Sequence, residues 1–288
     1  MNRFLRNKIV NPIRAFLSLA RDKNCVELEL PEVSKPYIPK ALFPYFWFAA
    51  MYNWDNYLSI YLSIYRKIYV WRPTYAVLNL DGLTYDEYFS HHIRSAERAL
   101  IRKAEKNGFV CKQINYDDYL DEILEINTSK TTRQGGEMTS DYTHVEKRDA
   151  ILSLVDAKVY NFGCFSETGK LVAYYTFEKI TNFYHVAKGI GHSDYLKYGI
   201  MNALFAYSVS QLSTGNGKVK YVIYGTCTEK AEAIFRFKRN VGCKVNHLMI
   251  KGNKEQIAAL QYFRKTYICE GDGEVHYVKD YVLANAKQ

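Results

Sequence analysis

The sequence NFYHVAKGIGHSDYLKYGIMNALFAY, residues 182–207, is the stretch that decides the fold. Its first part, Phe183–Val186, is rich in β-branched and aromatic residues and predicts a strand. After Gly189 and Gly191, apolar residues recur with the i, i+3, i+4, i+7 spacing of one helix face, at positions Ile200, Ala203, Leu204 and Tyr207. A strand therefore leads directly into the start of a helix.

That helix start is a predicted anion site. The first amides of a helix lack acceptors within the helix and lie at the positive end of its dipole. Tyr198, Gly199 and Ile200 supply these amides, and the missing side chain of Gly199 is expected to let a phosphate approach the backbone. The chain continues with KVKYVIYGTCTEKAEAIFRFKRNVG (218–242) and CKVNHLMI (243–250), which predict a strand, a helix and a final strand.

The overall composition is that of a folded protein with an excess of positive charge. Charged residues make up 24% of the 288 residues and hydrophobic residues 48%, which is usual for a globular chain. The net charge of +9 favours an anionic partner, such as a nucleotide cofactor, RNA or an acidic membrane surface. A basic surface that serves only solubility is the alternative.

The six cysteines show neither a CxxC pair nor the spacing of metal ligands. We therefore expect no metal site. Reduced thiols of a cytoplasmic protein, most of them in the core, are the simplest interpretation.

Residues 1–73 predict a helical, aromatic-rich N-terminal extension, and residues 74–288 predict the main domain. Within the extension, residues 1–23 mix basic with apolar residues around Pro12 but lack the continuous apolar region of a secretory signal. Two interpretations remain open, a solvated arm or a basic helix that rests on the inner face of an anionic membrane. The uncharged run Ala41–Trp54 is too short to span a bilayer as a helix.

The main domain predicts an alternation of strands and helices. The expected elements before the central stretch are a strand at 74–80, a helix at 84–104, a strand at 109–114, helices at 120–127 and 142–155, and strands at 157–165 and 171–178. Thr84 with Glu87 forms a capping box, and Gly108 is expected to end the first helix. This order resembles that of the GNAT N-acyltransferases, which implies an α/β fold with a mixed central sheet flanked by helices.

The segment Leu196–Phe205 is similar to the phosphate-binding segment of the GNAT fold, which usually reads Arg or Gln, two residues, Gly, any residue, and Gly or Ala. Gly199 matches the pattern, whereas Leu196 and Met201 replace the basic or amide residue and the second glycine. The resemblance implies acyl-CoA as a co-substrate. The residues that it assigns to CoA binding are Val186, Lys188, Gly189, Lys197, Tyr198, Gly199, Ile200 and Asn202.

Two further stretches resemble the FemAB-like branch of this superfamily, RALIRKAEKNGF at 98–109 and AIFRFKRNVG at 233–242. That branch implies transfer of an acyl or aminoacyl group to an amine on a sugar or peptide precursor of a surface polymer. Aminoacyl-tRNA is the alternative donor. The departures at Leu196 and Met201 favour a third alternative, a GNAT relative without catalysis that serves as a basic binding or membrane-surface module.

The resemblance places the reaction where the strand near 183–188 separates from the strand near 219–225. Tyr224, Thr226 and Cys227 are then the nearest side chains. Tyr224 either protonates a leaving thiolate or packs in the core. Cys227 is either a nucleophile or a residue that packs or shapes the substrate site, and no histidine adjoins it in sequence. Direct attack on the donor within a ternary complex is therefore expected.

Lys238 lies inside the apolar arc of the predicted helix Glu229–Asn240. An ammonium in that position needs an anionic partner, and the resemblance gives the matching lysine a functional role. The alternative is a lysine whose stem lies on the core while its head reaches water. Arg133 and Glu137 are predicted to bind the acceptor together with Thr226, and His185 is more typical of a satisfied core residue than of a base.

Overall fold

The computed structural model describes residues 25–29, 67–133, 136–137, 140–143, 145, 158–213, 219–226 and 232–253. The chain divides into two compact units. The described part of one unit lies within 75–245, and that of the other comprises 25–29, 67–74 and 246–253. Most of the predicted extension 1–73 lies outside the described residues, as do Cys227 and the predicted helix beyond residue 145.

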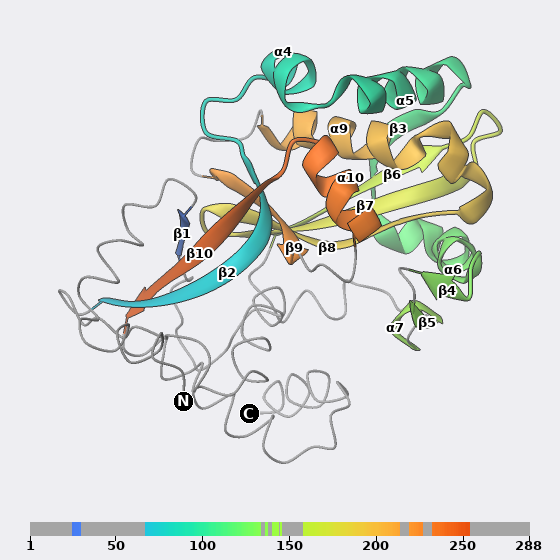
Figure 1. Cartoon of the computed structure of the whole chain (residues 1–288). Helices are drawn as coiled ribbons and strands as arrows, with labels where there is room; N and C mark the ends of the chain where they lie inside the picture. Colours follow the sequence, from blue (N-terminus) through green and yellow to red (C-terminus); the bar gives the residue numbers. More distant parts are fainter. Residues whose placement is uncertain are drawn as a thin grey trace. The chain divides into compact units, whose positions relative to one another are not determined.

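Residues 75–245 form a mixed sheet with helices on both faces (Figure 1). The strands are β2 (Lys67–Asn79, of which 75–79 belong to this unit), β3 (Val110–Ile114), β6 (Lys158–Phe165), β7 (Leu171–Ile180), β8 (Phe183–Gly191) and β9 (Tyr221–Thr226). Their order in space is β2-β9-β8-β7-β6-β3, and every neighbouring pair is antiparallel except β8 and β9. In the other unit β1 (Cys25–Glu29) pairs in parallel with β10 (Lys244–Asn253).

The helices of this unit lie on both faces of the sheet. One face carries α4 (Tyr85–Glu87), α5 (Ser95–Lys106), α9 (Ile200–Ser213) and α10 (Glu232–Asn240), and the opposite face carries α6 (Leu120–Thr128). Shorter elements are the π-helical turn η2 (Tyr88–His92), the 3-10 turns η3 (Tyr116–Tyr119) and η4 (Ser193–Tyr198), the hairpin of β4 (Thr132–Arg133) with β5 (Gly136–Glu137), and α7 (Ser140–Thr143). No helix among the described residues is long and apolar enough to cross a membrane.

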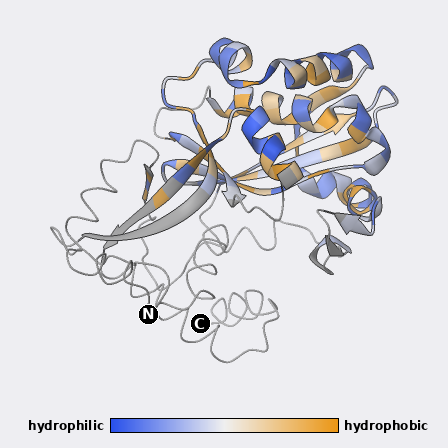
Figure 2. Ribbon diagram, viewed as in Figure 1, coloured by the Kyte–Doolittle hydropathy of each residue, from blue (hydrophilic) through white to orange (hydrophobic). Residues whose placement is uncertain are grey.

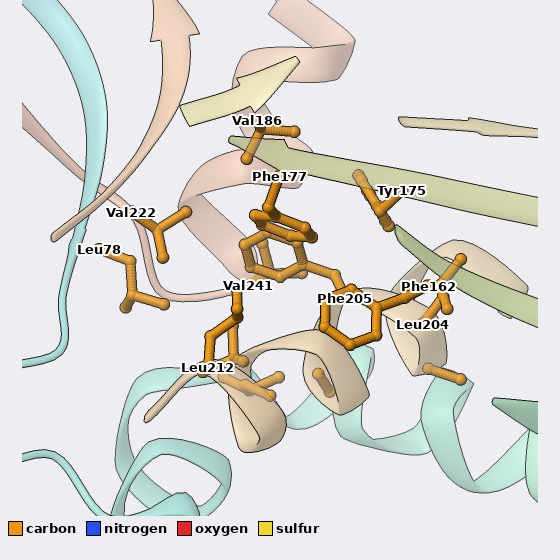
Figure 3. Close-up of a cluster of buried hydrophobic side chains, with 14 of the residues drawn as sticks. Leu78, Phe162, Tyr175, Phe177, Val186, Leu204, Phe205, Leu212, Val222 and Val241 are labelled. Carbon is orange, nitrogen blue, oxygen red and sulfur yellow. The ribbon is translucent and has the colours of Figure 1, made fainter. Parts of the chain in front are cut away.

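The larger core lies between the sheet and α9. Phe162 and Phe177 of the sheet pack with Phe205 of α9, and all three side chains are fully buried (Figure 3). Nine of the fourteen residues of α9 are buried, so apolar side chains lie on nearly all sides of the helix. The helix is therefore buried against both the sheet and α5. In contrast, Figure 2 shows hydrophilic residues along α10.

The predicted helix 84–104 is wrong as a continuous element. Thr84 does cap its start, because its hydroxyl accepts a hydrogen bond from the N–H of Glu87 at 3.2 Å. The helix then breaks at Ile93 and Arg94, which are extended, and α5 begins at Ser95. The Arg94 N–H donates to the carbonyl oxygen of Asn240 at the end of α10, so a tertiary contact replaces the helical bond. The predicted stop at Gly108 is confirmed by its positive φ of 74°.

Candidate functional site

The parallel strands β8 and β9 pair over only three residues each. Their register runs from Phe183–Tyr221 to His185–Ile223, although β8 continues to Gly191 and β9 to Thr226. The predicted separation of the two strands is therefore confirmed. We call the space that opens beyond His185 and Ile223 the strand gap. Strand pairing does not continue across it, so an extended ligand with amide groups can add hydrogen bonds along the two strand edges.

A β-bulge in β8 accounts for the separation. Thr176 of β7 lies opposite Lys188, but the next residue, Phe177, lies opposite Val186. Ala187 is thus an extra residue in β8. A bulge bends its strand and increases the local twist, which turns the end of β8 away from β9.

An aromatic side chain crosses β8 beside the strand gap. Tyr175 of β7 is opposite Gly189, and a Cβ atom built on Gly189 would lie 2.0 Å from Cε1 of Tyr175. The tyrosine ring therefore occupies the space of the missing side chain. Its hydroxyl forms a hydrogen bond with the hydroxyl of Tyr224 on β9. We call Tyr175 and Tyr224 the hydroxyl pair.

Tyr224 is held by packing as well as by this hydrogen bond. Its ring stacks on Phe205 of α9, with centroids 5.1 Å apart and planes at 24°, and it meets Phe237 of α10 edge-on. Burial raises the pKa of both Tyr175 and Tyr224 above the ordinary value of a phenol. Both hydroxyls therefore keep their protons at neutral pH and can act as donors.

Lys238 of α10 places an ammonium group at the end of β9. Its side chain is only 6% exposed, so the predicted inward position is confirmed. Nζ lies 5.2 Å from the ring centroid of Tyr224, within the range of a cation–π contact. The same atom would be 3.7 Å from a Cβ built on Gly225, a residue with a φ of +74° that favours glycine. The lysine head thus lies beside the backbone of β9 at Gly225, beyond the last residue of β9 that pairs with β8.

The start of α9 supplies the amides of Ile200 and Met201, but Gly199 has a different role from the predicted one. The carbonyl of Gly199 accepts the N–H groups of Asn202 and Ala203, so the amides of Ile200 and Met201 precede the first bond of the helix. A Cβ on Gly199 would lie 2.5 Å from the carbonyl oxygen of Leu100 in α5. The expected space for a phosphate beside Gly199 is therefore filled by α5, and the glycine serves helix packing.

These features, from the order of the elements to the bulge and the strand gap, identify the fold. Residues 75–245 have the GNAT fold. No family model matches the chain, and no curated protein sequence matches it. Among solved structures, L-PGS from Bacillus licheniformis is similar at 17% identity and a TM-score of 0.42, over 70% of this chain and 67% of that one.

Two further solved structures are similar. FemX has 10% identity and a TM-score of 0.48, over 66% of this chain and 64% of its own length. A tandem GNAT protein from the clavulanic acid biosynthesis pathway has 15% identity and a TM-score of 0.42, over 63% of this chain and 54% of its own. At these identities the likeness concerns the fold alone.

The other predicted CoA ligands lie on β8, which borders the strand gap, and on η4 and α9, which follow it in the chain. Val186 and Asn202 are buried, and Lys188 is half-buried with Nζ 5.1 Å from the ring centroid of Tyr142. Tyr198 lies close to two lysines, because Nζ of Lys103 and Nζ of Lys197 are 5.8 Å and 5.2 Å from its ring centroid. The basic groups therefore cluster one turn before α9.

The predicted acceptor residues occupy two places. Arg133 and Glu137 belong to the β4–β5 hairpin, in which Arg133 pairs with Gly136 and Glu137 with Thr132. Thr226 is the last residue of β9. His185 is 7% exposed and its Nδ1 lies 3.2 Å from Oε2 of Glu178, as expected of a satisfied core histidine. Among the described residues, no group of three or more His, Cys, Asp or Glu side chains is arranged to hold a metal ion.

Two residues of this site were not predicted from the sequence. Tyr175 is one of 26 tyrosines, and only its position opposite Gly189 distinguishes it. Lys103 lies on α5, and its Nζ donates to the carbonyl oxygen of Lys197 at 2.9 Å. The basic stretch 98–109 was a signal for Lys103, whereas the sequence held no signal for Tyr175.

Proposed function

We propose that this protein is a GNAT-type N-acyltransferase that moves an acyl or aminoacyl group from a thioester or ester donor to an amine. The strand gap carries this proposal. It combines the separated edges of β8 and β9 with one buried ammonium and a protonated phenol, which are the groups that transfer to an amine requires.

Each group has a role in direct attack. Backbone amides along the gap bind the donor arm in an extended conformation. Lys238 stabilises the negative charge that develops on the carbonyl oxygen, because its head lies beside Gly225 in a site with little water. Tyr224 donates its proton to the leaving sulfur or oxygen. No covalent enzyme intermediate is needed.

The donor that we propose is acyl-CoA. Its diphosphate would bind the amides of Ile200 and Met201, with Lys103 and Lys197 nearby to neutralise the charge. Gly199 shapes this turn through its contact with α5 and does not itself leave room for the diphosphate. The net charge of +9 supports an anionic donor.

Aminoacyl-tRNA is the second candidate donor, and the surface of α5 favours it. Arg102, Lys103 and Lys106 of this helix are all exposed, as is Arg94 just before its start. A row of cations suits a long phosphate backbone better than a single diphosphate. In either case, the proposed acceptor is an amine on a sugar or peptide precursor of a surface polymer, bound by Arg133, Glu137 and Thr226. The reaction would take place in the cytoplasm, with residues 1–23 as the contact to the inner face of the membrane.

A thermal-shift series with CoA, acetyl-CoA, and charged and uncharged tRNA tests the donor. A ligand at 100 times its dissociation constant stabilises the native state by about 2.7 kcal/mol. For a domain of this size, that is a rise in Tm of roughly 5–11 °C. Release of thiol in the presence of a panel of amino sugars and peptides then tests transfer.

Three outcomes separate the alternatives. A rise with CoA and release of thiol support the acyl-CoA proposal, and a rise with charged tRNA alone supports the second donor. Binding without transfer to any amine favours the module without catalysis. No rise with any of the four ligands would contradict the transferase proposal.

A further inference from the structure

The hydroxyl pair joins β7 to β9 at the level where β8 no longer pairs with β9. Backbone pairing between β8 and β9 ends at His185 and Ile223, and the side chain of Tyr175 then crosses β8 over Gly189 to reach Tyr224. A methyl group on Gly189 would overlap the Tyr175 ring. The ring of Tyr175 can therefore cross β8 only because the residue opposite it, Gly189, has no side chain.

The two tyrosines differ in their exposure. Tyr175 is fully buried, whereas Tyr224 is half-buried and carries the neighbouring Lys238 on its ring face. A hydroxyl has one proton to donate and can accept at the same time. If Tyr175 donates to the oxygen of Tyr224, the proton of Tyr224 is directed away from Tyr175 and is available to a group in the gap.

We propose that Tyr175 is a positioning residue that directs the hydroxyl of Tyr224 toward the leaving group of the donor. This inference rests on the proposed transferase function. Phe205 fixes the plane of the Tyr224 ring by stacking, but stacking leaves the hydroxyl free to rotate. The hydrogen bond with Tyr175 removes that freedom.

The proposed step transfers the acyl group from the sulfur or oxygen of the donor to the nitrogen of the amine. The amine nitrogen forms a bond to the acyl carbon, and the bond from that carbon to sulfur or oxygen breaks. Tyr224 gives its proton to the leaving sulfur or oxygen and becomes a phenolate. The donated hydrogen bond from Tyr175 and the ammonium of Lys238 stabilise this phenolate until it takes up the proton that the new amide nitrogen loses.

Tyr175→Phe tests the inference, because it keeps the ring over Gly189 and removes only the hydroxyl. Tyr174→Phe is a matched control on the same strand. Tyr174 is also fully buried, and its hydroxyl donates to Oδ1 of Asn127 on the opposite face of the sheet. Each variant therefore loses one hydrogen bond of a fully buried tyrosine, at a cost to stability of about 1 kcal/mol.

Each variant is assayed with two thioesters that share one acyl group. One is the alkyl thioester donor, whose thiolate is a poor leaving group and needs a proton. The other is an aryl thioester, whose thiolate leaves without a proton. In Tyr175→Phe, kcat with the alkyl thioester should fall by roughly tenfold to a hundredfold at unchanged KM, and kcat with the aryl thioester should stay near that of the wild type. Tyr174→Phe should keep both values.

Equal losses with both thioesters would overturn the inference, because a structural defect does not distinguish leaving groups. A double variant provides a second test. In the Tyr224→Phe background, Tyr175→Phe should cause no further loss of kcat, since it acts through Tyr224, and a further loss of the same size would contradict the proposal. If the wild type transfers to no amine from either thioester, the proposed acyl-CoA donor fails and this inference falls with it, whereas transfer from charged tRNA would still support the transferase function.

Discussion

Gly199→Ala is a direct test of the packing between α5 and α9. The structure gives two reasons why this position requires glycine. Its φ of +81° is a left-handed conformation that favours glycine, and the added methyl group would lie 2.5 Å from the Leu100 carbonyl oxygen and 2.8 Å from Leu100 Cβ. The carbonyl belongs to the backbone of α5, so it cannot move without shifting the helix.

The two effects can be separated by a matched glycine. Gly169, in the turn between β6 and β7, has nearly the same φ of +80°, and among the described residues no heavy atom lies within 4 Å of its Cβ position. Gly169→Ala should therefore cost only the conformational term, about 1–2 kcal/mol. Gly199→Ala adds overpacking, typically about 1–3 kcal/mol. The lower entropy of the unfolded chain, which favours alanine, is common to both variants.

The measurement is the free energy of unfolding of both variants in urea, together with their Tm. For a domain of this size, the extra 1–3 kcal/mol at Gly199 should lower Tm by a further 2–12 °C or so. Equal free energies of unfolding for Gly199→Ala and Gly169→Ala would show that α5 shifts to accommodate the added methyl group without loss of stability. The contact with Leu100 would then not explain why this position holds a glycine.

Three other predictions concern donor binding, residues 1–23 and the stability of the protein at alkaline pH. Lys238→Met keeps most of the side-chain volume and should weaken donor binding and turnover, while Arg239→Met, at an exposed neighbour on the same helix, should not; equal turnover and equal calorimetric affinity in both variants would refute a role for Lys238. Deletion of residues 1–23 should leave folding and turnover intact, and a large fall in Tm would instead show that this segment packs on the domain. Burial raises the pKa of Tyr184 to about 12, above its unfolded value of 10.0, so its contribution to stability is present below pH 10 and is lost as the pH rises toward 12. Urea unfolding across this range should give a shallower pH dependence in Tyr184→Phe, and an unchanged slope would contradict this.

Local patterns determined most of the elements, because their causes lie within a few residues. The apolar spacing from Ile200 predicted α9, and the observed helix covers Ile200–Ser213. The helix end at Gly108 and the helix cap at Thr84 were each predicted from single residues, and both are present. The break at Ile93 and Arg94 was missed because its partner, Asn240, is 146 residues away from Arg94 and no local pattern encodes that contact.

The sequence by itself determined the order of the elements and the inward position of Lys238, and its resemblance to the GNAT fold predicted the place where two strands separate. It could not determine which side chains meet there. In the uninterrupted register that pairs Phe177 with Val186, Tyr175 would face Lys188. The bulge at Ala187 shifts the register by one residue, so that Tyr175 faces Gly189 and its ring passes over the strand to Tyr224. A one-residue slip changes every opposing pair beyond it, and only the packing of the whole sheet against α9 decides whether that slip occurs.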